Sequence, residues 1–382
     1  MNNLLIFIIG IYLIICPFYF FESGVPQPAH YVAAIAFIAM VFSKDFRVIL
    51  KEKVVLYLLL FLLLTAIINS VYFFRYYSSG DGNIFILHTA YYIFNFLFFL
   101  LFLKTIKQGH SKGSIDKIAL CCLISLGIQV ILAIFDVNKV TQYIVTGRSV
   151  LYFNNPNQLG YFTLLMLTLF SILPSRYRNN KFIALFVLLG SVILAVVSGS
   201  RLVIVGVLVL AFSLLFQQGI KLKLEYWLVI SLVGLLATAF MYKTEFIQKK
   251  IALVEIRNHR QDTTGVSEAQ IRGYDRIWLN PKIVLYGSGE GKYDRFSSYH
   301  QLEIHSGFGT ILFSYGIMGL ITFMLFFYKV IEQRIFFNVL LLSPIILYNL
   351  AHQGFRNPLF WAVLASVYVA SLVHKKNRVK LS

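Results

Sequence analysis

The chain has 382 residues, of which 58% are hydrophobic and only 13% are charged, and its mean hydropathy is +0.75. A soluble domain cannot bury that much apolar surface, so the composition excludes a water-soluble protein. It predicts an all-α, polytopic integral membrane protein. The cysteines Cys16, Cys121 and Cys122 all lie in apolar segments and predict neither a disulfide nor a metal site.

The apolar segments divide the chain regularly. A helix that crosses a bilayer needs about 20 apolar residues. By that measure residues 1-382 form a single transmembrane domain with about 12 transmembrane helices, with eleven or thirteen left open because four segments are short. The first segment lacks a basic start and a small-residue cleavage site, so we expect it to stay uncleaved. The segments are 3–21, 30–43, 54–74, 85–103, 118–135, 157–174, 182–198, 202–217, 227–242, 306–328, 335–351 and 358–373.

Topology accounts for much of the net charge of +18. If the chain begins in the cytoplasm, 19 Lys and Arg residues fall in cytoplasmic connections and five in the short connections on the other side. The positive-inside rule then predicts that both termini are cytoplasmic. The one long polar loop, 243–305 between the ninth and tenth helices, is therefore expected to face the periplasm. Nucleic acid is not an expected partner.

The long loop 243–305 is predicted to contain short amphipathic helices and to form part of the active site. The apolar spacing in 245–258 indicates a helix lying on the membrane surface. A second helical stretch is expected over 267–279, before Pro281. The glycine-rich run 287–291 follows, and its bare backbone amides can approach a ligand closely.

Arg272 and Arg276 stand four residues apart on the second predicted helix, so we expect them to project from one face. Like charges at this spacing are unfavourable unless an anion lies between them. The guanidinium fork binds phosphate groups in a bidentate way, which favours a phosphate or diphosphate ligand. The alternative is a solvated basic face partnered by Asp275 and Glu268.

Arg201 follows a tight turn between two apolar segments of only about 16 residues each, which are shorter than the bilayer core. We therefore expect the turn to lie below the outer surface, with Arg201 buried in protein beside an anionic or carbonyl partner. An arginine that extends from a helix end towards the headgroups is the alternative.

Three further outward turns carry polar candidates. Arg148 precedes Tyr152, Asn154 and Asn157, whose amide and hydroxyl groups suit sugar hydroxyls, although Asn157 also suits plain helix capping. His305, with Glu303 nearby, stands where a helix begins and is the expected general base. His300 is its rival, and a purely structural histidine is the alternative. His352 and Arg356 form the last turn, and no metal-ligand spacing is found on this side.

Several short stretches follow one another in a characteristic order between residues 145 and 361. Ten residues separate Arg276 from Gly287, and the similar spacing from Arg148 to Gly160 is one residue longer. The stretches are Asn155-Pro156-Asn157-Gln158-Leu159-Gly160, Ser198-Gly199-Ser200-Arg201-Leu202, Arg276-Ile277-Trp278 with Gly287-Ser288-Gly289, and His305-Ser306-Gly307 with Ser314-Tyr315-Gly316-Ile317-Met318-Gly319-Leu320. In their order they resemble the O-antigen polymerase and O-antigen ligase superfamily of bacterial envelope proteins.

The resemblance implies a membrane glycosyltransferase in the bacterial inner membrane that uses an undecaprenyl-pyrophosphate-linked glycan as donor and another as acceptor at the periplasmic face. It implies no cofactor, and it implies membrane lipids, a chain-length regulator protein and a flippase as partners. Ligases of the superfamily often carry asparagine after the histidine. Here Ser306 follows His305, which favours a polymerase of the Wzy type.

On this hypothesis the transfer is inverting and metal-independent. His305 removes the acceptor proton, while Arg201, Arg272 and Arg276 stabilise the charge on the leaving diphosphate. The remaining candidates, Arg148, Tyr152, Asn154, Asn157, His300, Glu303, His352 and Arg356, bind substrate. An O-antigen ligase that transfers polymer to lipid A core, a transporter or flippase of lipid-linked oligosaccharide, and a non-catalytic scaffold remain as alternatives.

Overall fold

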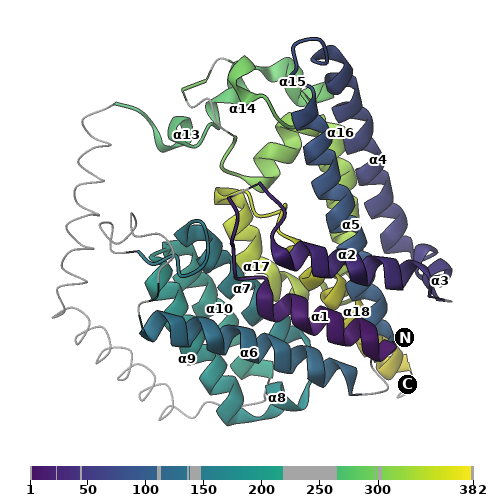
Figure 1. Ribbon diagram of the computed structural model, residues 1–382, viewed down its shortest axis with the longest axis vertical. Coiled ribbons are helices and arrows are strands. Elements are labelled where there is room, and N and C mark those ends of the chain that lie inside the picture. Colours follow the sequence, from purple (N-terminus) through teal and green to yellow (C-terminus); the bar gives the residue numbers. More distant parts are fainter. Residues whose placement is uncertain are drawn as a thin grey trace.

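The computed structural model describes residues 2–22, 24–43, 45–109, 113–135, 137, 148–217, 265–296, 298–299 and 303–379. Within these ranges the chain is helical and contains no β-strand (Figure 1). The elements are α1 (Asn2–Ile15), α2 (Pro28–Val41), α3 (Phe46–Leu50), α4 (Lys53–Arg75), α5 (Asn83–Gly109), α6 (Ser114–Ile134), α7 (Pro156–Ile172), α8 (Arg176–Asn179), α9 (Lys181–Ser198), α10 (Arg201–Gln217), α13 (Glu268–Ile271), α14 (Asp275–Leu279), α15 (Pro281–Tyr286), η2 (Tyr293–Arg295), α16 (Gly307–Ile331), η3 (Glu332–Arg334), α17 (Ile335–Ala351) and α18 (Pro358–Val379).

Five helical stretches of the described chain are long and apolar enough to cross a membrane. They are α4, α5, α6, α9 and the continuous stretch of α16, η3 and α17, and shorter apolar helices accompany them. Large apolar side chains such as Leu56 and Phe186 are exposed on the outer faces of these helices. Exposed apolar faces of this kind suit contact with lipid. For the described residues, the prediction of an all-helical fold with helices that could span a membrane is confirmed, whereas the count of about 12 spans stays a prediction.

Helix α7 lies at the centre of the bundle and contacts α6, α9, α10, α17 and α18. Its residues from Leu159 to Ile172 are all buried. A helix with apolar residues on every side can pack against other helices on every side. The hydroxyls of Thr163, Thr168 and Ser171 donate to backbone carbonyls four residues earlier at 2.7–2.9 Å. These bonds satisfy the polar groups inside the core.

The glycine-rich run 287–291 packs into a break in α16. Gly316 interrupts that helix with φ +67° and ψ −174°. Ser288 and Gly289 donate their backbone N–H groups to the Ser314 carbonyl oxygen at 3.0 and 2.8 Å. Two of the stretches that carry the family resemblance therefore lie against each other, which the sequence order alone does not show.

Figure 1 shows α14 and α15 at the top of the molecule, with α15 against α16, and α13 to their left in the upper half of the view. The short helix α8 lies at the bottom, and both chain ends lie in the lower half of the view. The segment α13–α15 and the basic connection around α8 are thus at opposite ends of the described structure.

Two expectations about helices are wrong. The first helix ends at Ile15 instead of 21, because Pro17 cannot continue it. The stretch 267–279 is two short helices, since Gly273 adopts φ +72° between α13 and α14. Arg272 and Arg276 therefore do not project from one helix face. The expected helices at 227–242 and 245–258 lie outside the described residues.

Replacement of Gly316 by alanine tests the break in α16. A Cβ atom there would lie 2.6 Å from the Leu285 carbonyl oxygen, in a backbone conformation that favours glycine. We expect Gly316→Ala to lower the free energy of unfolding by about 1–3 kcal/mol, seen as a lower thermal midpoint in detergent. Gly127→Ala, in helix α6 with nothing within 4 Å of its added Cβ, is the control and should not lower the midpoint. Equal midpoints for wild type and Gly316→Ala would contradict the account.

Candidate functional site

Two groups of polar side chains include residues of the loop 352–357, which joins α17 to α18. His352 belongs to the first group and Arg356 to the second. The first, here called the Arg–His cluster, contains Arg148, Arg272, His305 and His352. The second, here called the Arg356 cluster, contains Glu290, Glu303 and Arg356. Each is built below from its contacts.

Arg148 reaches the Arg–His cluster from the segment before α7. Its Nη2 donates to Asn157 Oδ1 at 2.8 Å, and its Nε donates to the Ser198 carbonyl oxygen at 2.8 Å. A Cβ atom on Gly199 would lie 2.9 Å from Arg148 Cγ, and Gly199 has φ +63°. Glycine is therefore required at position 199, because φ is positive there and because the Arg148 side chain leaves no room for a Cβ atom.

Arg272 joins three parts of the chain at the end of α13. Its Nη1 donates to the Ala351 carbonyl oxygen at 2.7 Å, and its Nε pairs with Glu268 Oε1 at 2.9 Å. Its own carbonyl oxygen accepts a hydrogen bond from the His305 backbone N–H at 3.0 Å. The guanidinium of Arg272 is thus held at the end of α17, beside the segment that carries His305.

His352 stands among the other members of this cluster. Its ring lies 4.7 Å from that of Tyr348, whose hydroxyl donates to the Asn157 carbonyl oxygen at 2.9 Å. Burial lowers the pKa of His352 to about 4, and the nearby charges of Arg272, His305 and Arg148 act in the same direction. The imidazole is therefore neutral at neutral pH.

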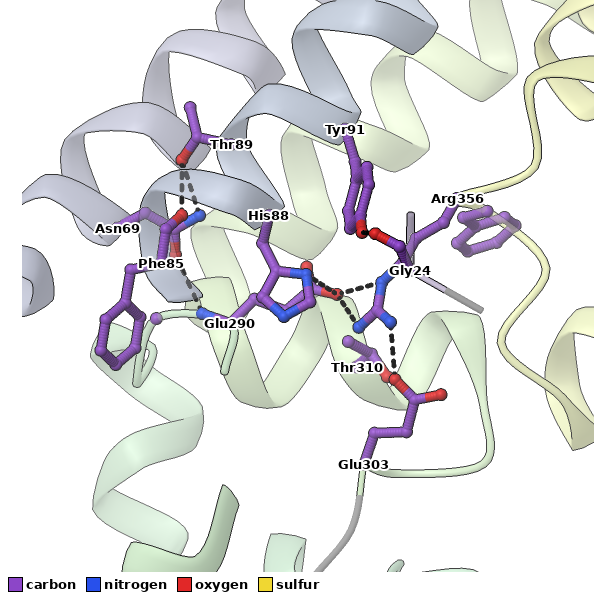
Figure 2. Close-up of polar contacts among 12 residues, drawn as sticks. Gly24, Asn69, Phe85, His88, Thr89, Tyr91, Glu290, Glu303, Thr310 and Arg356 are labelled. Atoms are coloured by element: carbon purple, nitrogen blue, oxygen red, sulfur yellow. Dashed lines mark hydrogen bonds and ion pairs between the residues drawn. The ribbon is translucent and has the colours of Figure 1, made fainter. Parts of the chain in front are cut away.

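Figure 2 shows the Arg356 cluster, in which one guanidinium contacts two carboxylates. Arg356 donates to Glu290 Oε1 from Nε at 2.9 Å and from Nη2 at 2.5 Å. Its Nη1 donates to Glu303 Oε2 at 2.7 Å, and its Nη2 also reaches the Tyr293 hydroxyl at 3.2 Å. The side chain of Arg356 is 22% exposed, that of Glu303 35% and that of Glu290 0%.

Glu290 is fully buried because the glycine-rich run carries it between α4, α5 and α16. Its backbone N–H donates to Asn69 Oδ1 at 2.9 Å, and Tyr315 donates its hydroxyl proton to Glu290 Oε2 at 2.6 Å. Burial by itself raises the pKa of Glu290, but the charge of Arg356 and the hydrogen bonds lower it below its ordinary value. Burial likewise lowers the pKa of Arg356, and the two carboxylates raise it well above the ordinary value. Both groups are therefore charged in the folded protein.

Arg276 is completely buried and borders the Arg356 cluster instead of Arg272. Its Nη2 donates to Ser298 Oγ at 3.1 Å, and its guanidinium lies 5.3 Å from the Tyr293 ring and 5.9 Å from the Phe313 ring. Burial lowers its pKa. Tyr293 is shared, since its hydroxyl contacts Arg356 while its ring contacts Arg276.

The expectation that Arg201 is buried in protein is wrong, because its side chain is exposed at the start of α10. Ser198 and Ser200 in this turn are buried, and the guanidinium of Arg148 donates to the Ser198 carbonyl oxygen. Tyr152 and Asn154 lie by the segment after α1: the Tyr152 ring is 5.2 Å from that of Phe18, and Asn154 Nδ2 donates to the Phe21 carbonyl oxygen at 3.0 Å. Asn157 contacts Arg148, as described above. His300 lies outside the described residues.

Sequence reasoning missed Glu290, Tyr293, Asn69 and Tyr315. A signal for Glu290 was present: it is one of only 16 acidic residues in a chain with 34 basic ones, and it stands between two glycines. Tyr315 lies in one of the stretches that carry the resemblance, whereas Asn69, a single polar residue in an apolar helix, gave no such signal.

No known protein-family model matches this sequence, and no significantly similar curated protein was found.

The neutral state of His352 can be tested by pH. Its folded pKa of about 4 lies below the ordinary 6.5, so the unfolded chain binds a proton first as the pH falls. His352 therefore contributes stability above pH 6.5 that is lost as the pH falls towards 4, amounting to at most about 3 kcal/mol. We expect the thermal midpoint in detergent to fall more steeply between pH 6.5 and 4.5 for wild type than for His352→Gln. Parallel pH profiles would show that protonation of His352 is not opposed by its surroundings.

Proposed function

We propose that this protein is a polytopic glycosyltransferase of the bacterial inner membrane that polymerises undecaprenyl-pyrophosphate-linked repeat units at the periplasmic face. In this proposal about 12 helices span the membrane, both termini are cytoplasmic and the loop 243–305 is periplasmic. The five helical stretches that are long and apolar enough to cross a membrane support a membrane-embedded protein. The position of α13–α15 opposite α8, which carries Arg176 and Arg178, agrees with the proposed sidedness (Figure 1).

One observation carries the proposal: Arg148 and Arg272, which are far apart in the sequence, lie around the same neutral imidazole together with His305. Glu268 already pairs with Arg272 at 2.9 Å, and an anion placed between Arg272 and Arg148 would add favourable interactions with both guanidinium groups. Planar guanidinium groups bind phosphate oxygens in a bidentate way, so a diphosphate is the ligand that suits them best. Arg148 thereby takes the place that the sequence suggested for Arg201.

The chemistry follows from that ligand. The diphosphate of the donor lies between Arg148 and Arg272, and the bond between its oxygen and the anomeric carbon breaks as the acceptor oxygen attacks from the opposite side. His305 takes the proton of the acceptor hydroxyl. The guanidinium groups stabilise the charge that develops on the leaving diphosphate. The energy is stored in the donor's own linkage, so the reaction needs no nucleotide.

Ser306 does not separate polymerase from ligase as the sequence suggested. Its hydroxyl caps α16 by accepting the Gly309 N–H at 3.0 Å, and asparagine caps a helix equally well. A ligase therefore remains the alternative within the superfamily, and a transporter or flippase the alternative outside it.

Deletion of the gene distinguishes these functions in the bacterium that carries it. Loss of a polymerase leaves single repeat units on the acceptor, whereas loss of a ligase leaves full-length polymer on the carrier lipid. Loss of a flippase leaves single units on the cytoplasmic side. We expect the first phenotype, and stranded polymer or cytoplasmic single units would contradict the proposal.

Arg272→Gln tests the diphosphate contact. A charge-assisted hydrogen bond contributes about 1.5–3 kcal/mol, so we expect polymerisation to slow by about 10- to 150-fold with the protein level unchanged. Arg176→Gln is the matched control: its arginine is exposed on α8 at the other end of the molecule and should not be needed. Equal rates for Arg272→Gln and Arg176→Gln would remove Arg272 from the site.

A further inference from the structure

The Arg356 cluster contains two carboxylates and one guanidinium, whereas the Arg–His cluster contains two guanidinium groups and two imidazoles. Glu290 alone neutralises Arg356, since it accepts from both Nε and Nη2 of that guanidinium. Glu303 adds a second carboxylate to the same guanidinium. The three charged side chains therefore sum to one negative charge, and the buried Arg276 beside the cluster offsets it, so this region carries little net charge and suits a neutral ligand that donates hydrogen bonds.

Glu303 is the member of this cluster that a ligand can reach. Its side chain is 35% exposed, whereas that of Glu290 is completely buried. Its oxygen Oε2 accepts from Arg356, and its other oxygen accepts no hydrogen bond from the part of the chain that the structure describes. A fixed carboxylate with one oxygen available is an acceptor for hydroxyl groups.

The two clusters are close enough to bind one pair of substrates. Glu303 and His305 flank the buried Ile304, and the chain turns at His305, where the Ser306 N–H donates to the Ile304 carbonyl oxygen at 2.8 Å. Even a fully extended chain would separate the Cα atoms of Glu303 and His305 by only about 7 Å. The hydrogen bond from His305 N–H to the Arg272 carbonyl oxygen holds this segment beside the Arg–His cluster. A sugar that contacts Glu303 is therefore within reach of His305.

We propose that Glu303 binds the hydroxyl groups of the acceptor sugar, so that the site has an acceptor-sugar subsite at the Arg356 cluster and a diphosphate subsite at the Arg–His cluster. Glu290 is a positioning residue: it neutralises Arg356 from the buried side and so leaves Glu303 able to face the acceptor. This inference rests on the proposed function.

The experiment measures binding of two probes to the purified full-length protein in detergent. One probe is farnesyl pyrophosphate, a short lipid diphosphate without sugar, and the other is the repeat-unit oligosaccharide released from its carrier by mild acid. We expect Glu303→Gln to weaken oligosaccharide binding by about 10- to 100-fold, the range for one charge-assisted hydrogen bond, and to leave farnesyl pyrophosphate binding unchanged. Arg272→Gln should do the reverse.

Asp294→Asn is the matched control, because it removes an exposed carboxylate from the same loop and should change neither affinity. Glu290→Gln tests whether Glu290 positions Glu303 through Arg356. It should weaken oligosaccharide binding while farnesyl pyrophosphate still binds, which a variant that fails to fold would not do. If Glu290→Gln does not fold, Glu303→Gln and Arg272→Gln still decide the question.

The outcomes separate this inference from the proposed function. Wild-type protein that binds neither probe contradicts both. Wild-type protein that binds farnesyl pyrophosphate but not the oligosaccharide overturns the acceptor subsite alone. The same holds if Glu303→Gln leaves both affinities unchanged or weakens both equally.

Discussion

The ion pair between Arg356 and Glu290 ties together the parts of the chain that build the site. Glu290 comes from the glycine-rich run after α15, Arg356 from the loop between α17 and α18, and Tyr315 and Asn69 support the carboxylate from α16 and α4. A buried carboxylate without its partner would be strongly unfavourable, so these elements have to meet in one arrangement. The loop 352–357 is thereby fixed at Arg356, and His352 at its other end is fixed beside Arg148 and Arg272.

This arrangement gives the two ends of one short loop different electrostatic characters. The His352 end lies among guanidinium groups, and the Arg356 end lies among carboxylates. A glycosyl transfer from a lipid diphosphate needs both, because the leaving group is an anion and the acceptor is a neutral sugar. The segment 303–305 runs between the two ends and carries the proposed acceptor contact and the proposed base. The site therefore follows from the way that a few loops cross at one end of the helical bundle.

The apolar segments predicted most helices well, because about 20 consecutive apolar residues have few other structures available. The count of Lys and Arg in the connections placed all the candidate residues on one side of the membrane, and the structure brings His305, Arg272, Arg148 and His352 near one another but not Arg201 and Arg276. Reasoning from the sequence failed where contacts between distant parts of the chain determine the structure. The break at Gly273 separates Arg272 from Arg276, and the crossing of Arg148 over Gly199 leaves Arg201 exposed. The burial of Glu290 depends on the break at Gly316 and on polar groups from distant helices, which no local pattern reveals.

The central claim is that this protein itself joins lipid-linked repeat units. The most direct measurement incubates the purified full-length protein in detergent, where there is no membrane to cross, with undecaprenyl-pyrophosphate-linked repeat units, and analyses the products by mass spectrometry. The account predicts products of two or more units on one carrier, together with released undecaprenyl pyrophosphate. Folded protein that binds the lipid-linked unit and returns only single units would contradict it.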